Sequence, residues 1–182
     1  MKNFFGKEFT KEEQVEILLI MMLLSGVFGF IYEEIFYWID LGYIVKRGST
    51  FGPIIPIYFF GGGLIVLGSY RLRKNPFLVF LINNIITGIL EYGTGYVLDH
   101  FFHLRLWDYN NEILNYGNIN GYICLRSILF FGVASLFLIY IVLPIVLKGK
   151  RRFSKEKVKW ITWICTMTFI LDMIIHFLLT RK

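Results

Sequence analysis

Five apolar runs, each about twenty residues long, constrain this chain more than any other feature. They cover residues 15–38, 54–70, 77–98, 128–147 and 160–179. About twenty helical residues cross the hydrocarbon core of a bilayer, so these runs are typical of transmembrane helices. Because 56% of the residues are hydrophobic, too few polar side chains remain to cover a soluble core. We therefore predict an all-α, polytopic membrane protein with about five transmembrane helices in one membrane domain, residues 1–182.

The first two runs begin differently. Thr10, followed three residues later by Glu13, forms the pattern of a capping box and predicts a helix start before the first run. Pro53 and Pro56 interrupt the start of the second run, and Pro56 suits the first position of a helix, where no N–H donor is needed. The Gly/Pro-rich segment 48–63 leaves two interpretations open. It is either an outer loop leading into a helix or, at residues 48–56, non-helical backbone that re-enters the membrane.

Basic residues flank the runs unevenly. Of the 19 Lys and Arg residues, 13 lie in the alternate segments 2–11, 71–74 and 148–159, and 6 lie in segments 46–47, 105–126 and 181–182. The positive-inside rule predicts a cell-membrane protein with a cytoplasmic N-terminus and an extracytoplasmic C-terminus. A basic run beside a span is a signal of topology and of lipid-headgroup contact, so we expect no nucleic-acid partner.

Polar residues gather in the outer half of the predicted bundle. On the third run, Asn84, Thr87, Glu91 and Thr94 recur every three or four residues and therefore share one helix face. Glu91 lies roughly 10 Å inside the outer end of that run. A carboxyl group at this depth must face the bundle interior, a wet cavity or a basic partner.

The first run carries a face that matches. Gly26 and Gly29 would let the first and third helices approach closely beside Glu33. Arg47 and Arg126 are the candidate partners of the carboxylates, because a guanidinium fork binds carboxylate or phosphate bidentately. For any single residue of this set, a purely structural role in bonding between helices is an equally good explanation. The concentration of the whole set at one membrane depth favours a functional site.

The predicted functional cluster draws on the first three runs and on the two outer segments. Its members are Glu33, Arg47, Gly52, Pro53, Tyr58, Asn84, Thr87, Glu91, Thr94, Trp107, Asp108, Tyr109, Asn120 and Arg126. Asp99, His100 and His103 have a spacing seen at metal sites, but the further ligands of zinc motifs are missing. Cys124 and Cys165 are isolated. We expect no metal ion and no cofactor.

Several blocks, in order from about residue 29 to 132, resemble the bacterial family called putative ABC-transporter permeases. They are Gly29-Phe-Ile-Tyr-Glu33, Arg47-Gly48-x-x-x-Gly52-Pro53-x-x-Pro56-Ile57-Tyr58-x-x-Gly61, Leu90-Glu91-Tyr92-x-Thr94, Phe102-His103-x-Arg105-x-Trp107-Asp108-Tyr109 and Asn118-x-Asn120-Gly121-x-x-Cys124-Leu125. The chain departs from the family pattern at Asp99, Leu106, Asn110 and Tyr122, where the pattern has Glu, Trp, Ser and Arg.

The resemblance implies a multi-pass bacterial membrane protein with a role in transport. The sequence contains no G-x-x-x-x-G-K-[ST] phosphate loop. A permease of this kind would therefore need a separate ATPase subunit, and residues 148–159 are the inner segment best able to dock one.

Three functions remain open, and the sequence leaves undecided whether the protein is an enzyme. The first is a permease-like subunit that moves a small or amphipathic solute past Glu33, Arg47 and Glu91. The second is a membrane-embedded enzyme or binding protein for a lipid or isoprenoid. In it, Glu91 or Asp108 would act as acid or base, and Arg47 or Arg126 would hold a phosphate. The third is a structural or regulatory subunit whose polar groups join helices. The lipid bilayer is an expected partner in all three.

Overall fold

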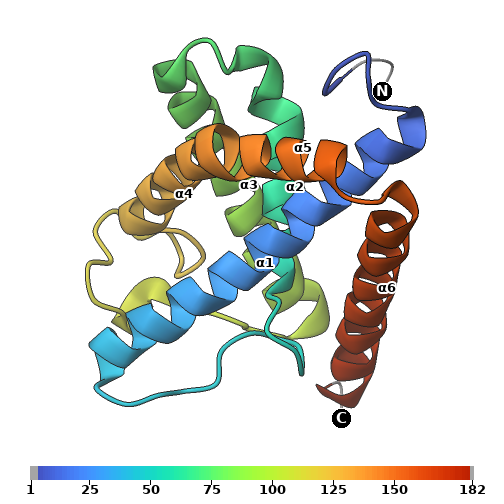
Figure 1. The fold of residues 1–182 in the computed structure, drawn as a ribbon. Helices are drawn as coiled ribbons and strands as arrows, with labels where there is room; N and C mark the ends of the chain where they lie inside the picture. Colours follow the sequence, from blue (N-terminus) through green and yellow to red (C-terminus); the bar gives the residue numbers. More distant parts are fainter. Residues whose placement is uncertain (1–3, 181–182) are drawn as a thin grey trace.

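The computed structural model describes residues 4–180, and this range contains helices but no β-strand (Figure 1). Lys2, Arg181 and Lys182, which entered the charge comparison, lie outside the described residues. Four helices in this range are long and apolar enough to cross a membrane. They are α1 (Lys11–Leu41), α3 (Pro76–Phe102), the continuous helix Leu125–Arg152 and α6 (Lys155–Thr180).

Large apolar side chains cover much of the outer surface of these helices. Ile35, Phe77, Ile89 and Ile164 are all more than half exposed. Side chains of this kind suit a surface that faces lipid, whereas in water they would form a large apolar patch. The chain is therefore a multi-pass membrane protein, as predicted.

Local chemistry explains where the first and third helices begin. The predicted capping box at α1 is confirmed, because Thr10 Oγ1 accepts from the Glu13 N–H at 3.2 Å and the Glu13 carboxylate accepts from the Thr10 N–H at 2.8 Å. At α3, the Asn75 side chain accepts from the Leu78 N–H at 3.2 Å, and Pro76 occupies the first turn.

The helix Leu125–Arg152 is continuous but irregular. It consists of α4 (Leu125–Phe137), a π-helical turn, η3 (Leu138–Val142), and α5 (Leu143–Arg152). Pro144 is the second residue after the π turn. Proline cannot donate to the helical ladder and its ring crowds the preceding turn, so the wider π turn accommodates it.

The second predicted span corresponds to a shorter helix. It is α2 (Pro56–Ser69), of 14 residues, and the 3₁₀ turn η1 (Tyr70–Leu72) follows it. At 1.5 Å per residue, α2 is about 21 Å long and does not by itself span a hydrocarbon core of about 30 Å. The predicted number of about five transmembrane helices is therefore not confirmed.

The start of α2 lies beside the middle of α1 and not beside its end. The Ile55 N–H donates to the Gly26 carbonyl at 3.3 Å. A methyl group added to Gly26 would meet Ile54, and one added to Gly29 would meet the Tyr58 ring. From the sequence, this close approach was expected between the first and third helices. That prediction was wrong, because the segment that enters α2 occupies this face of α1.

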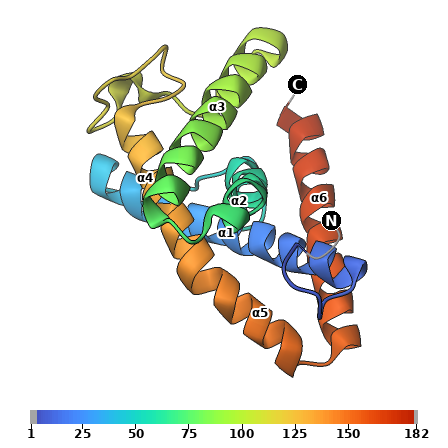
Figure 2. The ribbon, with the colours of Figure 1, turned by 90° about the horizontal axis from the view of Figure 1, so that it is seen from above.

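The two ends of the bundle are built from different segments, and we call them the elbow end and the loop end. The elbow end contains the start of α1 and the junction of α5 and α6, and Figure 2 shows these segments together. Lys155, in the first turn of α6, lies 3.0 Å from Glu13 of α1. The loop end contains the last turns of α1 and the connection between α3 and α4, residues 103–124. An apolar core near the elbow end includes Ile17, Met21 and Val66, which are buried.

Candidate functional site

The connection 103–124 folds back onto the helices at the loop end. Its short 3₁₀ turn, η2 (Tyr109–Asn111), is held by a hydrogen bond from the Tyr109 N–H to the Gly121 carbonyl at 3.0 Å. The Ile113 N–H donates to the Asp40 carboxylate of α1 at 3.3 Å. These contacts bring polar side chains of the connection between α1, α3 and α4.

Glu91 of α3 is 3% exposed and is bonded by neutral groups. The Tyr109 hydroxyl donates to its Oε1 at 2.5 Å, and the Ser127 hydroxyl donates to its Oε2 at 2.8 Å. Within residues 4–180, no Lys or Arg forms an ion pair with this carboxylate at 4.0 Å or less. The sequence suggested Arg47 and Arg126 as partners of this carboxylate. In the structure, both arginines form ion pairs with other acidic residues.

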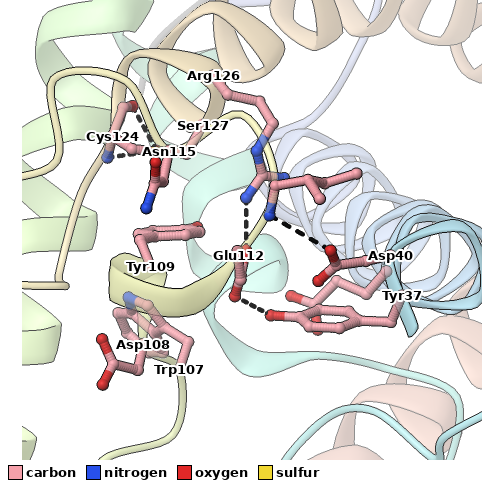
Figure 3. Close-up of polar contacts among 12 residues, drawn as sticks. Tyr37, Asp40, Trp107, Asp108, Tyr109, Glu112, Asn115, Cys124, Arg126 and Ser127 are labelled. Atoms are coloured by element: carbon pink, nitrogen blue, oxygen red, sulfur yellow. Dashed lines mark hydrogen bonds and ion pairs between the residues drawn. The ribbon is translucent and has the colours of Figure 1, made fainter.

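Arg126 instead binds Glu112, which the sequence analysis missed. Its Nη2 lies 2.5 Å from Glu112 Oε2, and the Tyr37 hydroxyl donates to Glu112 Oε1 (Figure 3). Burial of the Glu112 carboxyl raises its pKa above the usual value, although Tyr37 and Arg126 act in the opposite direction. No pattern in the sequence separates Glu112 from an ordinary exposed loop glutamate.

The rest of the Arg126 side chain is also enclosed. Its Nη1 lies 3.3 Å from the Tyr32 hydroxyl, and the guanidinium lies over the Phe36 ring at 3.8 Å. Its Nε is buried and has no hydrogen-bond partner among the described residues. A buried donor without an acceptor is costly, so a polar group that accepted from this N–H would stabilise the site.

Glu33 of α1 pairs with Arg47, as the sequence suggested. Arg47 Nε lies 3.4 Å from Glu33 Oε2, while the Arg47 backbone N–H donates to Glu34 at 2.9 Å. The Arg47 guanidinium also lies over the Tyr37 ring at 3.6 Å. Tyr37 therefore contacts both the Glu33–Arg47 and the Glu112–Arg126 pairs.

A small cavity joins these groups, and we call it the polar cavity. Its volume is about 30 Å³, enough for about one water molecule. Its lining residues are Tyr32, Glu33, Phe36, Tyr37, Ile57, Tyr58, Glu91, Trp107, Tyr109, Glu112, Arg126, Ser127, Phe130 and Phe131. Three carboxylates and a guanidinium thus surround one water-sized space.

The structure brings some of the predicted cluster together at this cavity. Those that line it are Glu33, Tyr58, Glu91, Trp107, Tyr109 and Arg126. Arg47 and Thr94 line an adjacent hollow between α2, α3 and α6. Tyr32, Tyr37, Glu112 and Ser127 also line the polar cavity but were not predicted.

Other predicted residues lie apart from the cavity. Asn84 Oδ1 lies beside Gly132, at the contact of α3 with α4, and the Thr87 hydroxyl donates to the Asn83 carbonyl within α3 at 2.6 Å. The Gly52 N–H donates to Asp172 of α6 at 2.8 Å, and Pro53 follows it in the chain.

Asp108 and Asn120 meet at an exposed cluster around Arg105. Arg105 Nη2 lies 3.2 Å from Asp108 and 2.7 Å from the Asn120 carbonyl. Asp99 also belongs to this cluster, since it accepts from the Tyr122 hydroxyl at 2.7 Å and from Arg105 at 3.4 Å. Among residues 4–180, no three His, Cys, Asp or Glu side chains are grouped as metal ligands.

Comparison with known protein families identifies the family of this chain. A family model described as "Putative ABC-transporter type IV" matches residues 20–177, which is most of the chain. No curated protein and no solved structure matches the chain significantly.

Proposed function

The chain belongs to the family described as "Putative ABC-transporter type IV", and on that premise we propose that it is a permease-like component of a bacterial membrane transport system. The polar cavity would be its binding or gating centre, and a separate ATPase would supply the energy. The observation that carries the proposal is a set of three carboxylates around one water-sized space at the loop end. Glu91 is buried, and Glu33 and Glu112 are partly buried. Ionisable groups at membrane depth are costly and commonly mark solute pathways.

The size of the cavity defines the state that the structure represents. A space of about 30 Å³ holds about one water molecule, so this is a closed form in which no solute of useful size fits. Movement of the connection 103–124 would open the cavity, because Trp107, Tyr109 and Glu112 form one wall. A shift of α1 would also open it but would break the Tyr37–Glu112 hydrogen bond and the Glu33–Arg47 ion pair.

The segment 42–72 supports a fifth, discontinuous crossing. The chain leaves α1 at Gly42 at the loop end, and Tyr70 donates to the Phe5 carbonyl at 3.2 Å near the elbow end. The non-helical residues 48–55 would make the first half of the crossing, and α2 would make the second. Non-helical backbone at membrane depth is tolerated where it is buried in protein or lines a cavity, and transporters place binding sites at such breaks.

The elbow end is the proposed cytoplasmic docking surface for the ATPase. Four of its cations are paired with acids of the α1 region: Lys150 with Glu16, Arg151 with Glu8, Lys155 with Glu13, and Lys159 with Glu12. The remaining surface exposes Phe153, at 63% exposure, between basic residues. An exposed aromatic residue among cations, on a junction fixed by ion pairs, suits contact with a partner protein.

Purification from the native membrane tests this proposal. The tagged chain would be extracted in mild detergent, and the proteins that accompany it would be quantified by mass spectrometry. We expect a stoichiometric ATPase with the wild type and at least a tenfold loss in Phe153→Asp. Tyr116→Asp, which alters an exposed aromatic residue at the loop end, should retain it. Absence of any ATPase from the wild-type preparation would overturn the permease proposal.

A further inference from the structure

Two hollows beside the polar cavity adjoin each other and share much of their lining. Their volumes are about 210 and 360 Å³, and they share the lining residues Ser49, Pro56, Ile57, Thr94, Leu98, Leu106 and His176. We call the combined space the lateral cleft. It lies between α2, α3 and α6, and Figure 2 shows α6 set apart from α3 along much of its length. Its size is in the range of small-molecule sites.

One end of the lateral cleft is basic. Lys46 and Arg47 line it together with the backbone of Gly48. Glu33 is the one acidic residue in this lining, and it already pairs with Arg47 at 3.4 Å. Lys46 is exposed, and its ammonium lies 5.7 Å from the centre of the Phe51 ring. The balance of charge at this end is therefore positive.

The other end of the lateral cleft is apolar and opens beside the lipid-facing surface. Phe60, Leu90 and Met173 line it. A further hollow on the flank of α3 shares Leu90, Thr94 and Leu98 with it. A methyl group added to Gly93 in this flank would meet no atom within 4 Å, so the surface is open there. Access from the side, within the plane of the bilayer, follows from this geometry.

We infer that the lateral cleft binds an anionic phospholipid, with its phosphate at Lys46 and Arg47 and an acyl chain between α2, α3 and α6. Charge complementarity selects the headgroup, because ammonium and guanidinium donors bind phosphate oxygens by charge-assisted hydrogen bonds. The apolar end selects a chain that would otherwise lie in the bilayer. The inference concerns binding and holds whether or not the chain acts in transport.

The experiment compares two lipids that differ only in the headgroup. The full chain would be purified in detergent, and native mass spectrometry would measure binding of phosphatidylglycerol and phosphatidylcholine with identical acyl chains. We expect the wild type to bind phosphatidylglycerol at least tenfold more tightly. Lys46→Glu should reduce this preference at least fivefold while binding of phosphatidylcholine stays unchanged.

Two further variants separate the cleft from general effects. Thr94→Trp would fill the space that both hollows share, so it should reduce binding of both lipids at least fivefold. Lys148→Glu makes the same charge change as Lys46→Glu at an exposed position in α5 and should change neither lipid. Thermal unfolding of each variant would show that it is folded.

Specific outcomes would overturn the inference. Equal binding of the two lipids by the wild type would exclude a headgroup site. An equal effect of Lys46→Glu and Lys148→Glu would show that only total charge matters. Unchanged binding in a folded Thr94→Trp variant would place the lipid elsewhere. None of these results bears on co-purification of an ATPase, so the two proposals fail separately.

Discussion

At the elbow end each of four carboxylates pairs with its own cation, whereas the three carboxylates that line the polar cavity have only two arginine partners among them. Glu16 and Lys150 are both almost fully buried, and their charges match one to one. At the loop end, Glu33 pairs with Arg47 and Glu112 pairs with Arg126, but Glu91 has only the hydroxyls of Tyr109 and Ser127.

This difference separates two uses of buried charge. Where every carboxylate has its own cation, no additional ligand is required, and the ion pairs hold α1 to α5 and α6. At the polar cavity, one carboxylate lacks a cation and Arg126 Nε lacks an acceptor. A proton, a water molecule or a solute that paired with these groups would therefore stabilise them. The stoichiometry of charges therefore distinguishes a structural cluster from a candidate functional one.

The largest expected effect is at the elbow end. Lys150→Met leaves Glu16 buried without a cation and should lower the free energy of unfolding by about 3–5 kcal/mol. Denaturant unfolding in detergent micelles would measure it. The double variant Glu16→Leu with Lys150→Met should recover most of the loss, because it removes both charges. A loss below about 1 kcal/mol in the single variant would show that the pair does not hold this end together.

Arg126→Met tests the loop end in the same way. It leaves Glu112 without its cation, but the Tyr37 hydroxyl still donates to that carboxylate. We expect a loss of about 2–3 kcal/mol in the free energy of unfolding, smaller than at Lys150. Adding Glu112→Gln should restore part of it. A loss greater than that of Lys150→Met would reverse the comparison between the two ends.

Glu91 should separate stability from function most sharply. Glu91→Gln keeps hydrogen-bonding atoms for Tyr109 and Ser127, so the free energy of unfolding should change by less than about 1 kcal/mol. In the purified complex with the proposed ATPase, we expect the same variant to lower solute-stimulated ATP hydrolysis at least tenfold. Glu91→Ala is the control for lost hydrogen bonds and should cost about 2–3 kcal/mol. Full activity in Glu91→Gln would favour a structural role for the cluster.

The pH dependence of stability should carry a smaller signal from Glu112. Its pKa in the folded protein lies above the usual value, so the folded state binds this proton more tightly than the unfolded state does. Its contribution to stability is complete below the unfolded pKa and is lost as pH rises through the folded pKa. Thermal unfolding between pH 4 and pH 8, a range chosen around the usual glutamate pKa of roughly 4.3, should show the wild type losing stability relative to Glu112→Gln as pH rises. The opposite trend would contradict the assignment.

The smallest effect is expected at an exposed pair of the elbow end. Lys159 lies 3.2 Å from Glu12, but both side chains are largely exposed. Lys159→Ala should change the free energy of unfolding by at most about 0.5 kcal/mol, and added salt should remove even that difference. A change as large as that of Lys150→Met would mean that the exposed pairs act as one network with the buried one.

Much of the fold followed from the sequence, because a bilayer demands long apolar helices. The runs 15–38, 77–98, 128–147 and 160–179 all lie within helices of membrane-spanning length. The run 54–70 was overestimated as a span, since hydropathy counts Ile54 and Ile55 although the backbone there is extended before Pro56. Apolar composition reports where a segment lies more directly than which conformation it adopts.

The candidate site was predictable only where helix periodicity operates. The spacing on α1 and α3 identified Glu33 and Glu91, and both line the polar cavity. Glu112 was missed because it lies in a connection without periodicity, and its burial depends on how residues 103–124 fold over the bundle. For the same reason the partner of Arg126 could not be chosen from the sequence.

The π turn at Leu138–Val142 allows one continuous helix to serve two neighbours. A π turn holds one residue more than an α turn, and one residue corresponds to about 100° of rotation about the helix axis. Before the turn, Gly132 faces Asn84 of α3; after it, Lys150 faces Glu16 of α1. The extra residue thus rotates α5 about the helix axis relative to α4. Lys150 can therefore face Glu16 without changing how α4 packs beside the polar cavity.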